Sequence, residues 1–389
     1  MLRKHTLGFT GVLVAAVAIA IVASGCSSTG AGQVVSVGPT FASQSLYATN
    51  TTQNGISIYP AGTKTGAGPQ YQIGGSNTTL AGPQYVTLDS LGDIFTTNWS
   101  ASTGTANILE FKALATGNVL PYNGAAFGSA HPRGIFDYQT TFASSTTKTD
   151  VLVVAVVDPT QPLSFSSQLQ FLEAAFVGGG TYNVIAGPLT GLDVPVGVAA
   201  DSSGNIYVAN SQGTSGANVE VFSVPSPSPT PSPTATPTAS PTPTPTPSGA
   251  TASPVPTPSP TATPENIAPL ATLTSEIGTP TGIALDANGN IYVADQASTV
   301  CSPHCPAILR FAASPTTGAA PTGAIAGAAT LLFAPTDVKV DSTGLIYVAD
   351  STSAGAGVVY VFAAGASGNV APIATFSSPG SVTGLGLSP

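Results

Sequence analysis

Charged residues are scarce in this chain of 389 residues, since Asp, Glu, Lys and Arg together make up 6 % of it. Only eight residues are Lys or Arg, against 17 acidic ones, which leaves a net charge of −9. Nucleic-acid binding needs clustered Lys and Arg to neutralise phosphates, so we expect no nucleic-acid partner. The composition does not indicate a disordered chain either, because charged residues are few and apolar residues reach 42 %.

Glycine and proline, by contrast, are abundant, with 43 and 35 residues. Many of the apolar residues are β-branched, which favours strands over helices. Short strands connected by many Gly- and Pro-containing turns are typical of all-β folds. The composition therefore predicts an all-β protein.

The N-terminus combines a basic start, MLRK, with an uncharged apolar run that ends in Ala-Ser-Gly before Cys26. A plain membrane anchor is one interpretation, because the run is just long enough to span a bilayer. The Cys after two small residues resembles a bacterial lipoprotein signal, although Ala23 stands where that family prefers Leu. The resemblance implies a signal peptide over residues 1–25, lipid attachment at Cys26 and a tether over residues 26–44. It also implies an exported, lipid-anchored protein at the outer membrane or cell surface, and Ser27 favours the outer membrane.

Three segments of the chain repeat almost the same wording: VPVGVAADSSGNIYVAN (194–210), TPTGIALDANGNIYVAD (279–295) and APTDVKVDSTGLIYVAD (334–350). Weaker copies lie at 82–98 and 131–158. Each copy contains two apolar runs, and a third run and a looser fourth segment follow it. Four short strands per repeat, at this period, predict the blades of a β-propeller.

The two ends of the chain carry the parts of one further repeat. LYATN, at 46–50, matches a second strand without a first, and VTGLGLS, at 382–388, matches a first strand. A blade divided between the termini closes the ring and leaves no open sheet edge. We therefore expect a six-bladed β-propeller over residues 45–389, closed by the C-terminal strand and acting as a monomer.

The pattern P-x-G-[IV]-A-x-D-x-x-G-N-I-Y-V-A-[DN] resembles the NHL-repeat family of propellers. The resemblance is strong in three blades and degenerate in the others. It implies the fold and not an activity, because that family includes protein-binding modules, scaffolds and a few lyases and lactonases.

An aspartate just before each central turn suggests a calcium loop, but these loops lack the Glu that usually completes such a site. An Asp at the first position of a turn also caps it, while the following Gly takes a positive φ. We predict the structural role. The aspartates are Asp89, Asp137, Asp201, Asp286 and Asp341. The small residues of the first strands are expected to pack at the crowded axis: Gly197, Ala199, Gly282, Ala284, Gly384 and Gly386.

An acid or amide also closes every second strand, and the up-and-down order of the strands places all of them at one mouth of the propeller. They cap turns there or form a polar rim that binds a ligand or cation. The six are Asn50, Asn98, Asp158, Asn210, Asp295 and Asp350. The loops at this mouth vary in length, which is typical of recognition surfaces. The candidate ligand-binding mouth therefore consists of Trp99, Asn98, Asn210, Asp295 and Asp350.

Trp99 is the only tryptophan, and aromatic side chains are frequent in binding hot spots. The alternative is that it merely covers the end of blade two. Cys301 and Cys305 are expected to form a disulfide in an exported chain, although a metal knuckle that includes His304 is an alternative.

Residues 225–264 contain Pro, Thr and Ser without charged or aromatic residues, so they cannot form a core. We interpret them as a disordered insertion between the third and fourth strands of blade four. It serves as an inert or glycosylated spacer, or it docks a partner or spans the wall.

The resulting hypothesis is a surface-anchored propeller lipoprotein that binds or scaffolds an unknown envelope protein or glycan. We expect no enzyme activity and no cofactor. The alternative is a propeller enzyme of the lyase or lactonase type with a metal in its channel. The family's metal sites need several His or a Glu/Asn/Asp set, whereas the mature chain has only His131 and His304, on blades that are not adjacent.

Overall fold

A computed structural model describes residues 44–141, 148–173, 183–212, 216–223 and 264–389. All of these residues belong to one compact unit, Gly38–Pro389. The predicted signal peptide, Cys26 and nearly all of the tether lie outside the described residues. Within the described residues, no helix is both long and apolar enough to cross a membrane.

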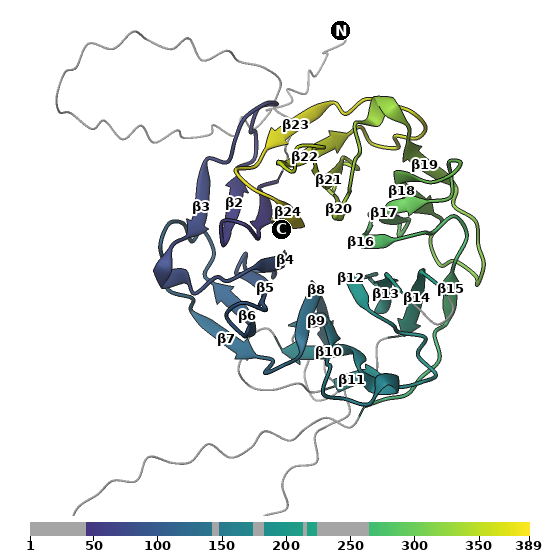
Figure 1. The fold of residues 1–389 in the computed structure, drawn as a ribbon, viewed down its shortest axis with the longest axis horizontal. Coiled ribbons are helices and arrows are strands. Elements are labelled where there is room, and N and C mark those ends of the chain that lie inside the picture. Colours follow the sequence, from purple (N-terminus) through teal and green to yellow (C-terminus); the bar gives the residue numbers. More distant parts are fainter. Residues whose placement is uncertain (1–43, 142–147, 174–182, 213–215, 224–263) are drawn as a thin grey trace, which may run out of the picture. The chain divides into compact units, whose positions relative to one another are not determined.

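The described strands form six antiparallel four-stranded sheets, which are the blades of a propeller (Figure 1). Blade one contains β24 (Val382–Leu387), β1 (Leu46–Asn50), β2 (Gly55–Tyr59) and β3 (Tyr71–Gly74). Blade two contains β4 (Pro83–Leu88), β5 (Ile94–Ser100), β6 (Thr105–Phe111) and β7 (Asn123–Ala126). Blade three contains β8 (His131–Thr141), β9 (Lys148–Val157), β10 (Ser167–Glu173) and β11 (Asn183–Ala186).

The other three blades follow the same order. Blade four contains β12 (Pro195–Ala200), β13 (Asn205–Asn210), β14 (Asn218–Ser223) and β15 (Ala271–Leu273). Blade five contains β16 (Pro280–Leu285), β17 (Ile291–Ser298), β18 (Cys305–Phe311) and β19 (Gly323–Ala326). Blade six contains β20 (Asp337–Val340), β21 (Ile346–Ser351), β22 (Gly357–Phe362) and β23 (Ala374–Ser377). Short 3-10 helices lie at η1 (Ser76–Thr78), η2 (Leu163–Phe165) and η4 (Ala328–Thr330).

The C-terminal strand closes the ring, as the sequence predicts. β24 pairs antiparallel with β1, with Leu46 opposite Leu387 and Ala48 opposite Leu385. In Figure 1 the yellow C-terminal strand accordingly lies beside the purple N-terminal strands. The innermost strands β24, β4, β8, β12, β16 and β20 contact one another in this order, and β20 contacts β24 again. The all-β, six-bladed propeller with terminal strand closure is confirmed.

The second strands are apolar on both faces because each blade is packed between two others. In β13, Ile206 and Val208 belong to a core cluster shared with blade three. Tyr207 and Ala209, which point the opposite way, belong to a cluster shared with blade five. Alternation along a strand sends successive side chains to opposite faces, so one strand contributes to two cores.

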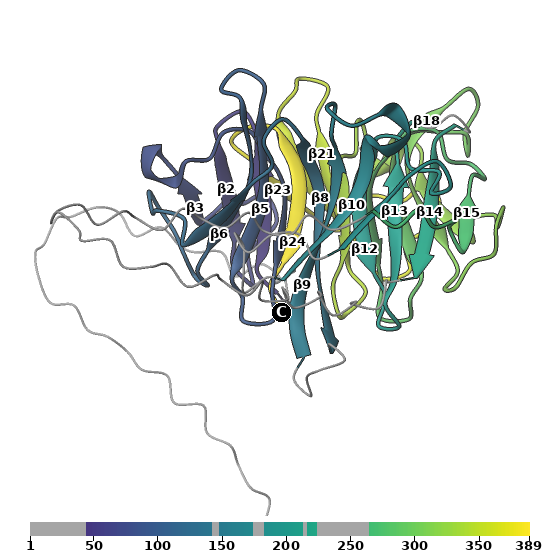
Figure 2. The ribbon, with the colours of Figure 1, turned by 90° about the horizontal axis from the view of Figure 1, so that it is seen from below.

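The propeller has two different ends, a turn end and a loop end. The turn end carries the turns between first and second strands, such as 201–204 and 286–289. The loop end carries the segments after the second strands and those that lead into each first strand. Figure 2 shows β9 extending past the strands of the neighbouring blades at the turn end, where the C-terminus also lies, and β8 pairs with β9 along this extension.

The aspartates at the turn end cap their turns. The Oδ1 atom of Asp286 accepts hydrogen bonds of 2.9 Å from the backbone N–H groups of Asn288 and Asn290, and Gly289 has a φ of 78°. Asp89, Asp201 and Asp341 accept equivalent backbone bonds. These four carboxylates therefore have the structural role that the repeat pattern predicts.

Asp137 differs from the other turn aspartates, so its predicted role is wrong. It lies inside β8, opposite Leu152 of β9, and does not begin a turn. The Pro132-x-Gly134 motif shows why. When the blades are aligned on this motif, Tyr138 stands where the other blades have the turn aspartate, and Asp137 stands one residue earlier. The hairpin of β8 and β9 is also longer than its counterparts, so both strands continue past the usual turn.

The predicted insertion falls almost entirely on residues 224–263, which lie outside the described residues. The strands on either side of it, β14 and β15, pair with each other. Directly after it, Glu265 forms a bridge with Ile185 of blade three.

Candidate functional site

The acids near the loop-end termini of the second strands hold the neighbouring loops in place. Asp295 accepts backbone hydrogen bonds from Gly278 at 2.7 Å and from Thr279 at 2.8 Å. Asp350 accepts them from Phe333 at 2.9 Å and from Ala334 at 2.7 Å. Each carboxylate thus ties the end of a second strand to the segment that leads into the first strand. Burial raises the pKa of Asp350, although these backbone bonds oppose the shift.

The amides at the same position act in the same way. The Oδ1 atom of Asn98 accepts a bond of 2.7 Å from Ala81, and its Nδ2 atom donates to Asn107. Asn210 accepts a bond of 2.8 Å from Asp193 and donates to Asn218.

The candidate mouth residues on the second strands are buried, which changes the role that they can have in binding. Asn98, Asn210, Asp295 and Asp350 are all 0 % exposed. A ligand at the loop end therefore meets the loops that these residues hold, and not their side chains. Of the other two, Asn50 is buried, and Asp158 accepts bonds from the backbone N–H and the hydroxyl of Thr160. Turn capping, one of the two alternatives for this set, describes their contacts.

Trp99 packs across the boundary between two blades. It lies near the end of β5, partly exposed, with its ring centroid 4.5 Å from that of His131 at the start of β8. Burial and the nearby positive charge of Arg133 lower the pKa of His131, while Asp158 opposes the shift. The imidazole is therefore mostly neutral near pH 7. The pair Trp99–His131 forms a small aromatic surface at the loop end of blades two and three.

The disulfide loop also belongs to the loop end. Cys301 and Cys305 are bonded, in the segment between β17 and β18, and His304 between them is exposed. The bond ties this segment to the first residue of β18.

Threonines at the middle position of the Pro-x-Gly motif, near the start of the first strands, link blades five, six, one and two around the axis. The hydroxyl of Thr281 donates to the carbonyl of Pro335 at 2.8 Å, and that of Thr336 donates to Val382 at 3.0 Å. Thr383 continues the series to Pro83 at 3.3 Å. The three remaining blades have other residues at this position, namely Gln84, Arg133 and Val196. The loop-end mouth is thus regular on one side and irregular on the other.

Arg133 occupies the irregular side. Its side chain is partly buried and has no hydrogen-bond or ion-pair partner among the residues that the structure describes. Its positive charge affects both Tyr85 and His131, so the guanidinium lies close to the axis and to the aromatic pair. A guanidinium offers five N–H donors in a planar fork that fits a carboxylate or phosphate.

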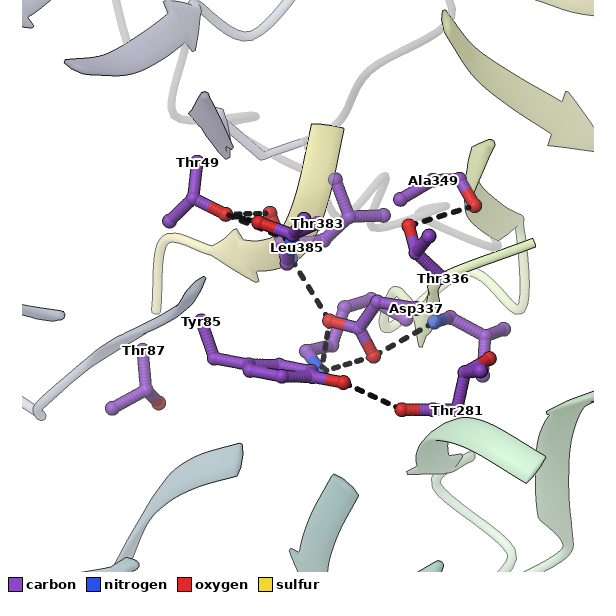
Figure 3. Close-up of polar contacts among 12 residues, drawn as sticks. Thr49, Tyr85, Thr87, Thr281, Thr336, Asp337, Ala349, Thr383 and Leu385 are labelled. Carbon is purple, nitrogen blue, oxygen red and sulfur yellow. Dashed lines mark hydrogen bonds and ion pairs between the residues drawn. The ribbon is translucent and has the colours of Figure 1, made fainter. Parts of the chain in front are cut away.

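The axis is filled one residue further along the first strands, where Tyr85 and Asp337 replace the usual glycine (Figure 3). The hydroxyl of Tyr85 crosses the axis from blade two and donates to the carbonyl of Thr281 in blade five at 2.6 Å. Burial and the negative charge of Asp337 raise the pKa of Tyr85, so the phenol stays protonated.

Asp337 is 1 % exposed and is paired within its own strand. The Nζ atom of Lys339 lies 3.1 Å from Oδ2 and 3.3 Å from Oδ1 of the carboxylate. The backbone N–H of Leu385 in blade one donates to Oδ2 at 2.9 Å. Burial raises the pKa of Asp337, and Lys339 opposes this shift.

Glycines in the adjacent blades make room for the two side chains. A Cβ atom at Gly282 would lie 2.5 Å from Asp337, and one at Gly384 would lie 2.6 Å from Tyr85. Both approaches are too close for a side chain. The small residues of the first strands therefore permit packing at the axis, as predicted.

A cavity of about 290 Å³ lies on the turn-end side of Tyr85 and Asp337. All six innermost strands line it, and its charged members are Asp137 and Lys339. The Oδ1 atom of Asp137 is buried without a hydrogen-bond partner in the described part of the chain. Burial, and then repulsion from Asp150 and Asp89, raise the pKa of Asp137 to about 8. Among the described residues, no group of three or more His, Cys, Asp or Glu side chains is arranged to hold a metal ion.

Sequence reasoning missed Tyr85, Arg133, Asp337 and Lys339. The sequence does mark three of them, Tyr85, Asp337 and Lys339. Each departs from the repeated motif P-x-G-[IV]-A at a position where most blades have a small residue. Arg133 gave no such signal, because it stands at the variable position x of that pattern, where three blades have Thr and the other two have Gln84 and Val196. Departures from a repeat mark the positions where blades are not equivalent.

Comparison with known proteins gives structural similarity only. No family model and no curated protein matches the chain. Its similarity to NHL repeats therefore rests on the repeated sequence motif alone. A gluconolactonase from Xanthomonas campestris is 12 % identical, with a TM-score of 0.43, over 90 % of this chain and 91 % of the other. A putative 6-phosphogluconolactonase from Bacteroides uniformis is also 12 % identical, with a TM-score of 0.45, over 85 % and 82 %. The major allergen Mala s 1 of Malassezia sympodialis is 12 % identical, with a TM-score of 0.42, over 72 % and 74 %.

Proposed function

We propose that this protein is a lipid-anchored propeller of the cell envelope that binds an anionic envelope component at its loop end. The observation that carries the proposal is Arg133, a partly buried cation without a partner among the described residues, next to the Trp99–His131 pair. The ligand presents a carboxylate or phosphate to the guanidinium and an apolar or sugar face to the aromatic rings.

The energetic argument starts from the guanidinium. A partly buried charge that lacks a counter-ion has lost part of its hydration without compensation. A bidentate carboxylate or phosphate restores both the charge balance and the hydrogen bonds. The unpaired Arg133 therefore raises the free energy of the unbound protein, and pairing with the ligand lowers it again.

The surrounding frame supports a binding role because it is rigid. Asn98 and Asp295 tie the loop segments to the strands, and the Cys301–Cys305 bond closes the segment before β18. Loops that are already ordered lose little conformational entropy when they bind a ligand. The irregular loops on this frame then provide the specificity.

The binding role is tested with defined anionic polymers of the envelope, such as uronic-acid glycans and phosphate-containing wall polymers. We expect Arg133→Gln to weaken binding by about tenfold to a hundredfold, because a hydrogen bond to a charged group contributes about 1.5–3 kcal/mol. Trp99→Ala should weaken it by several-fold. Titration on a biosensor surface at physiological salt provides the measurement.

Lys148→Gln is the matched control, since it removes one exposed positive charge at the turn end. It should bind like the parent protein. If Lys148→Gln weakens binding as much as Arg133→Gln does, the interaction depends on overall charge and the proposed loop-end site is wrong.

The anchor is tested separately, because Cys26 lies outside the described residues. Cells that express Cys26→Ser and are fed a clickable fatty acid should yield an unlabelled, uncleaved protein, whereas Cys301→Ser should be labelled like the parent. Labelling of Cys26→Ser would mean that the lipid is attached elsewhere or that no lipoprotein signal is present.

One observation favours the alternative of a propeller enzyme with a metal in the channel. Asp137 lines the axial cavity, and a pKa of about 8 is suitable for a general acid or base near neutral pH. Stoichiometric zinc or calcium in the purified protein, together with a loss of that metal in Asp137→Asn, would favour the enzyme over the binding function.

A further inference from the structure

The axial cavity at the turn end has an unusual combination of residues. Most of its lining is aliphatic or aromatic, including Leu88, Phe136, Ile283 and Leu285. Asp137 places a carboxyl group on this apolar wall. A carboxyl group in such a position is normally paired, because an unpaired one loses hydration without compensation.

The carboxyl group of Asp137 has no hydrogen-bond or ion-pair partner among the described residues around it. Its Oδ1 atom is buried and accepts no hydrogen bond within the described residues. Its nearest charged neighbours on β9 and on the turn after β4 are the acids Asp150 and Asp89, which raise its pKa further. The Oδ1 atom of Asp150 also lacks a hydrogen-bond partner in the described part of the chain, while Oδ2 accepts one from Ser90. The electrostatic potential at Asp137 is therefore negative whenever the carboxyl ionises.

The other charged groups near the cavity already have partners within the chain. Lys339 of β20 is bonded to both oxygens of Asp337. On the side of β12, the carboxylate of Asp201 accepts bonds from Asn205 and from the hydroxyl of Tyr207. Neither element supplies a free cation to Asp137 within the described part of the chain, so a cation bound in the cavity would provide its charge partner.

The volume limits the size of that partner. A water molecule occupies about 30 Å³ in the liquid, so 290 Å³ is room for at least roughly ten non-hydrogen atoms. Tyr85 and Asp337 fill the axis on the loop-end side, which leaves access from the turn end. A ligand of this size needs an apolar body for the lining and one positively charged group for Asp137.

We propose that the axial cavity binds a small organic cation, with its ammonium group paired to Asp137 and its apolar body against Phe136 and the leucines of the first strands. This site is distinct from the loop-end site and does not depend on it. Binding is linked to protonation, because the ammonium group stabilises the carboxylate form of Asp137 and a proton is released at pH 7.

The pH dependence follows from the sign of this linkage. With a pKa of about 8, Asp137 is mostly protonated at pH 6 and about half ionised at pH 8. The apparent affinity scales with the ionised fraction, so it should rise roughly tenfold or more between pH 6 and pH 8. An alkylammonium keeps its own proton over this range, because its pKa is near that of Lys, about 10.4.

The test uses phenethylammonium, which has about nine non-hydrogen atoms and so fits the volume, and its neutral analogue 2-phenylethanol. Both are titrated calorimetrically into the purified full-length protein, in buffers with different ionisation enthalpies. We expect phenethylammonium to bind at least about tenfold more tightly than the alcohol at pH 8, with release of a proton.

Two variants separate charge recognition from shape. Asp137→Asn keeps the size of the side chain and should remove the preference for the ammonium over the alcohol. Ala200→Phe adds a ring to the lining and should abolish binding of both ligands without changing any charge. Asp158→Asn, which removes an aspartate at the opposite end, is the control and should bind like the parent.

Four results would overturn the proposal. Three of them are equal binding of the two ligands by the parent protein, an unchanged ammonium preference in Asp137→Asn, and an affinity that does not increase between pH 6 and pH 8. Binding that survives Ala200→Phe would place the ligand outside the cavity and would overturn it as well.

Discussion

A chain that ends at residue 381 should fail to fold into a soluble propeller. The truncation removes β24, which pairs with β1 and places the buried side chains of Val382 and Leu385 in the core. It also removes the backbone N–H that bonds Asp337. The loss opens the ring and exposes the edge of β1 and the inner faces of the neighbouring blades. Exposed strand edges of this kind pair with other chains, so we expect aggregation.

The truncated chain is compared by size-exclusion chromatography and thermal melting with a chain that ends at residue 387. The longer chain loses only Ser388 and Pro389 and keeps all of β24. It should remain monomeric, with a melting temperature within a few degrees of the parent protein. A monomeric 381-residue chain with an unchanged melting temperature would refute closure by the terminal strand.

Lys339→Ala should lower the free energy of unfolding by about 3–5 kcal/mol at pH 8. Asp337 is 1 % exposed and keeps its charge through Lys339 and the backbone of Leu385. Removal of the lysine leaves a buried carboxylate without a counter-ion, which is more costly than the loss of an exposed ion pair. Chemical denaturation monitored by circular dichroism provides the measurement.

Two comparisons identify the cause. The double variant Asp337→Gly/Lys339→Ala gives blade six the Gly and Ala that blade five has at Gly282 and Ala284, and it should recover most of the lost stability. The deficit of the single variant should also shrink as the pH falls. Its buried Asp337 has a raised pKa, so the native state takes up a proton more readily than the unfolded state does. A double variant no more stable than Lys339→Ala, or a deficit independent of pH, would show that the cost arises from packing.

The candidate sites were harder to predict than the fold, for reasons that particular residues illustrate. The sequence singled out Asn98, Asn210, Asp295 and Asp350 as turn caps or as a polar rim, because they belong to a set of six that recurs at the loop end of the second strands. Recurrence is typical of a structural role, and all four are buried under the loops that they hold. Arg133 and Asp137, which carry the proposed binding chemistry, do not recur and so gave no pattern to detect. Asp137 was even assigned to a turn, since its blade departs most from the shared wording.

The sequence by itself determined the class of fold, the number of blades, the division of one blade between the termini and the capping of four turns. Each of these features is encoded by a short local pattern that recurs along the chain. The copies of the pattern therefore support one another's interpretation. Only the tertiary structure decided what the axis contains, which side of the mouth is irregular and which carboxyl group has no partner. The bond from Tyr85 to Thr281 joins residues 196 positions apart in the chain. Such contacts form only when the ring closes and brings the departures from the repeat together, and no single blade contains the information that would predict them.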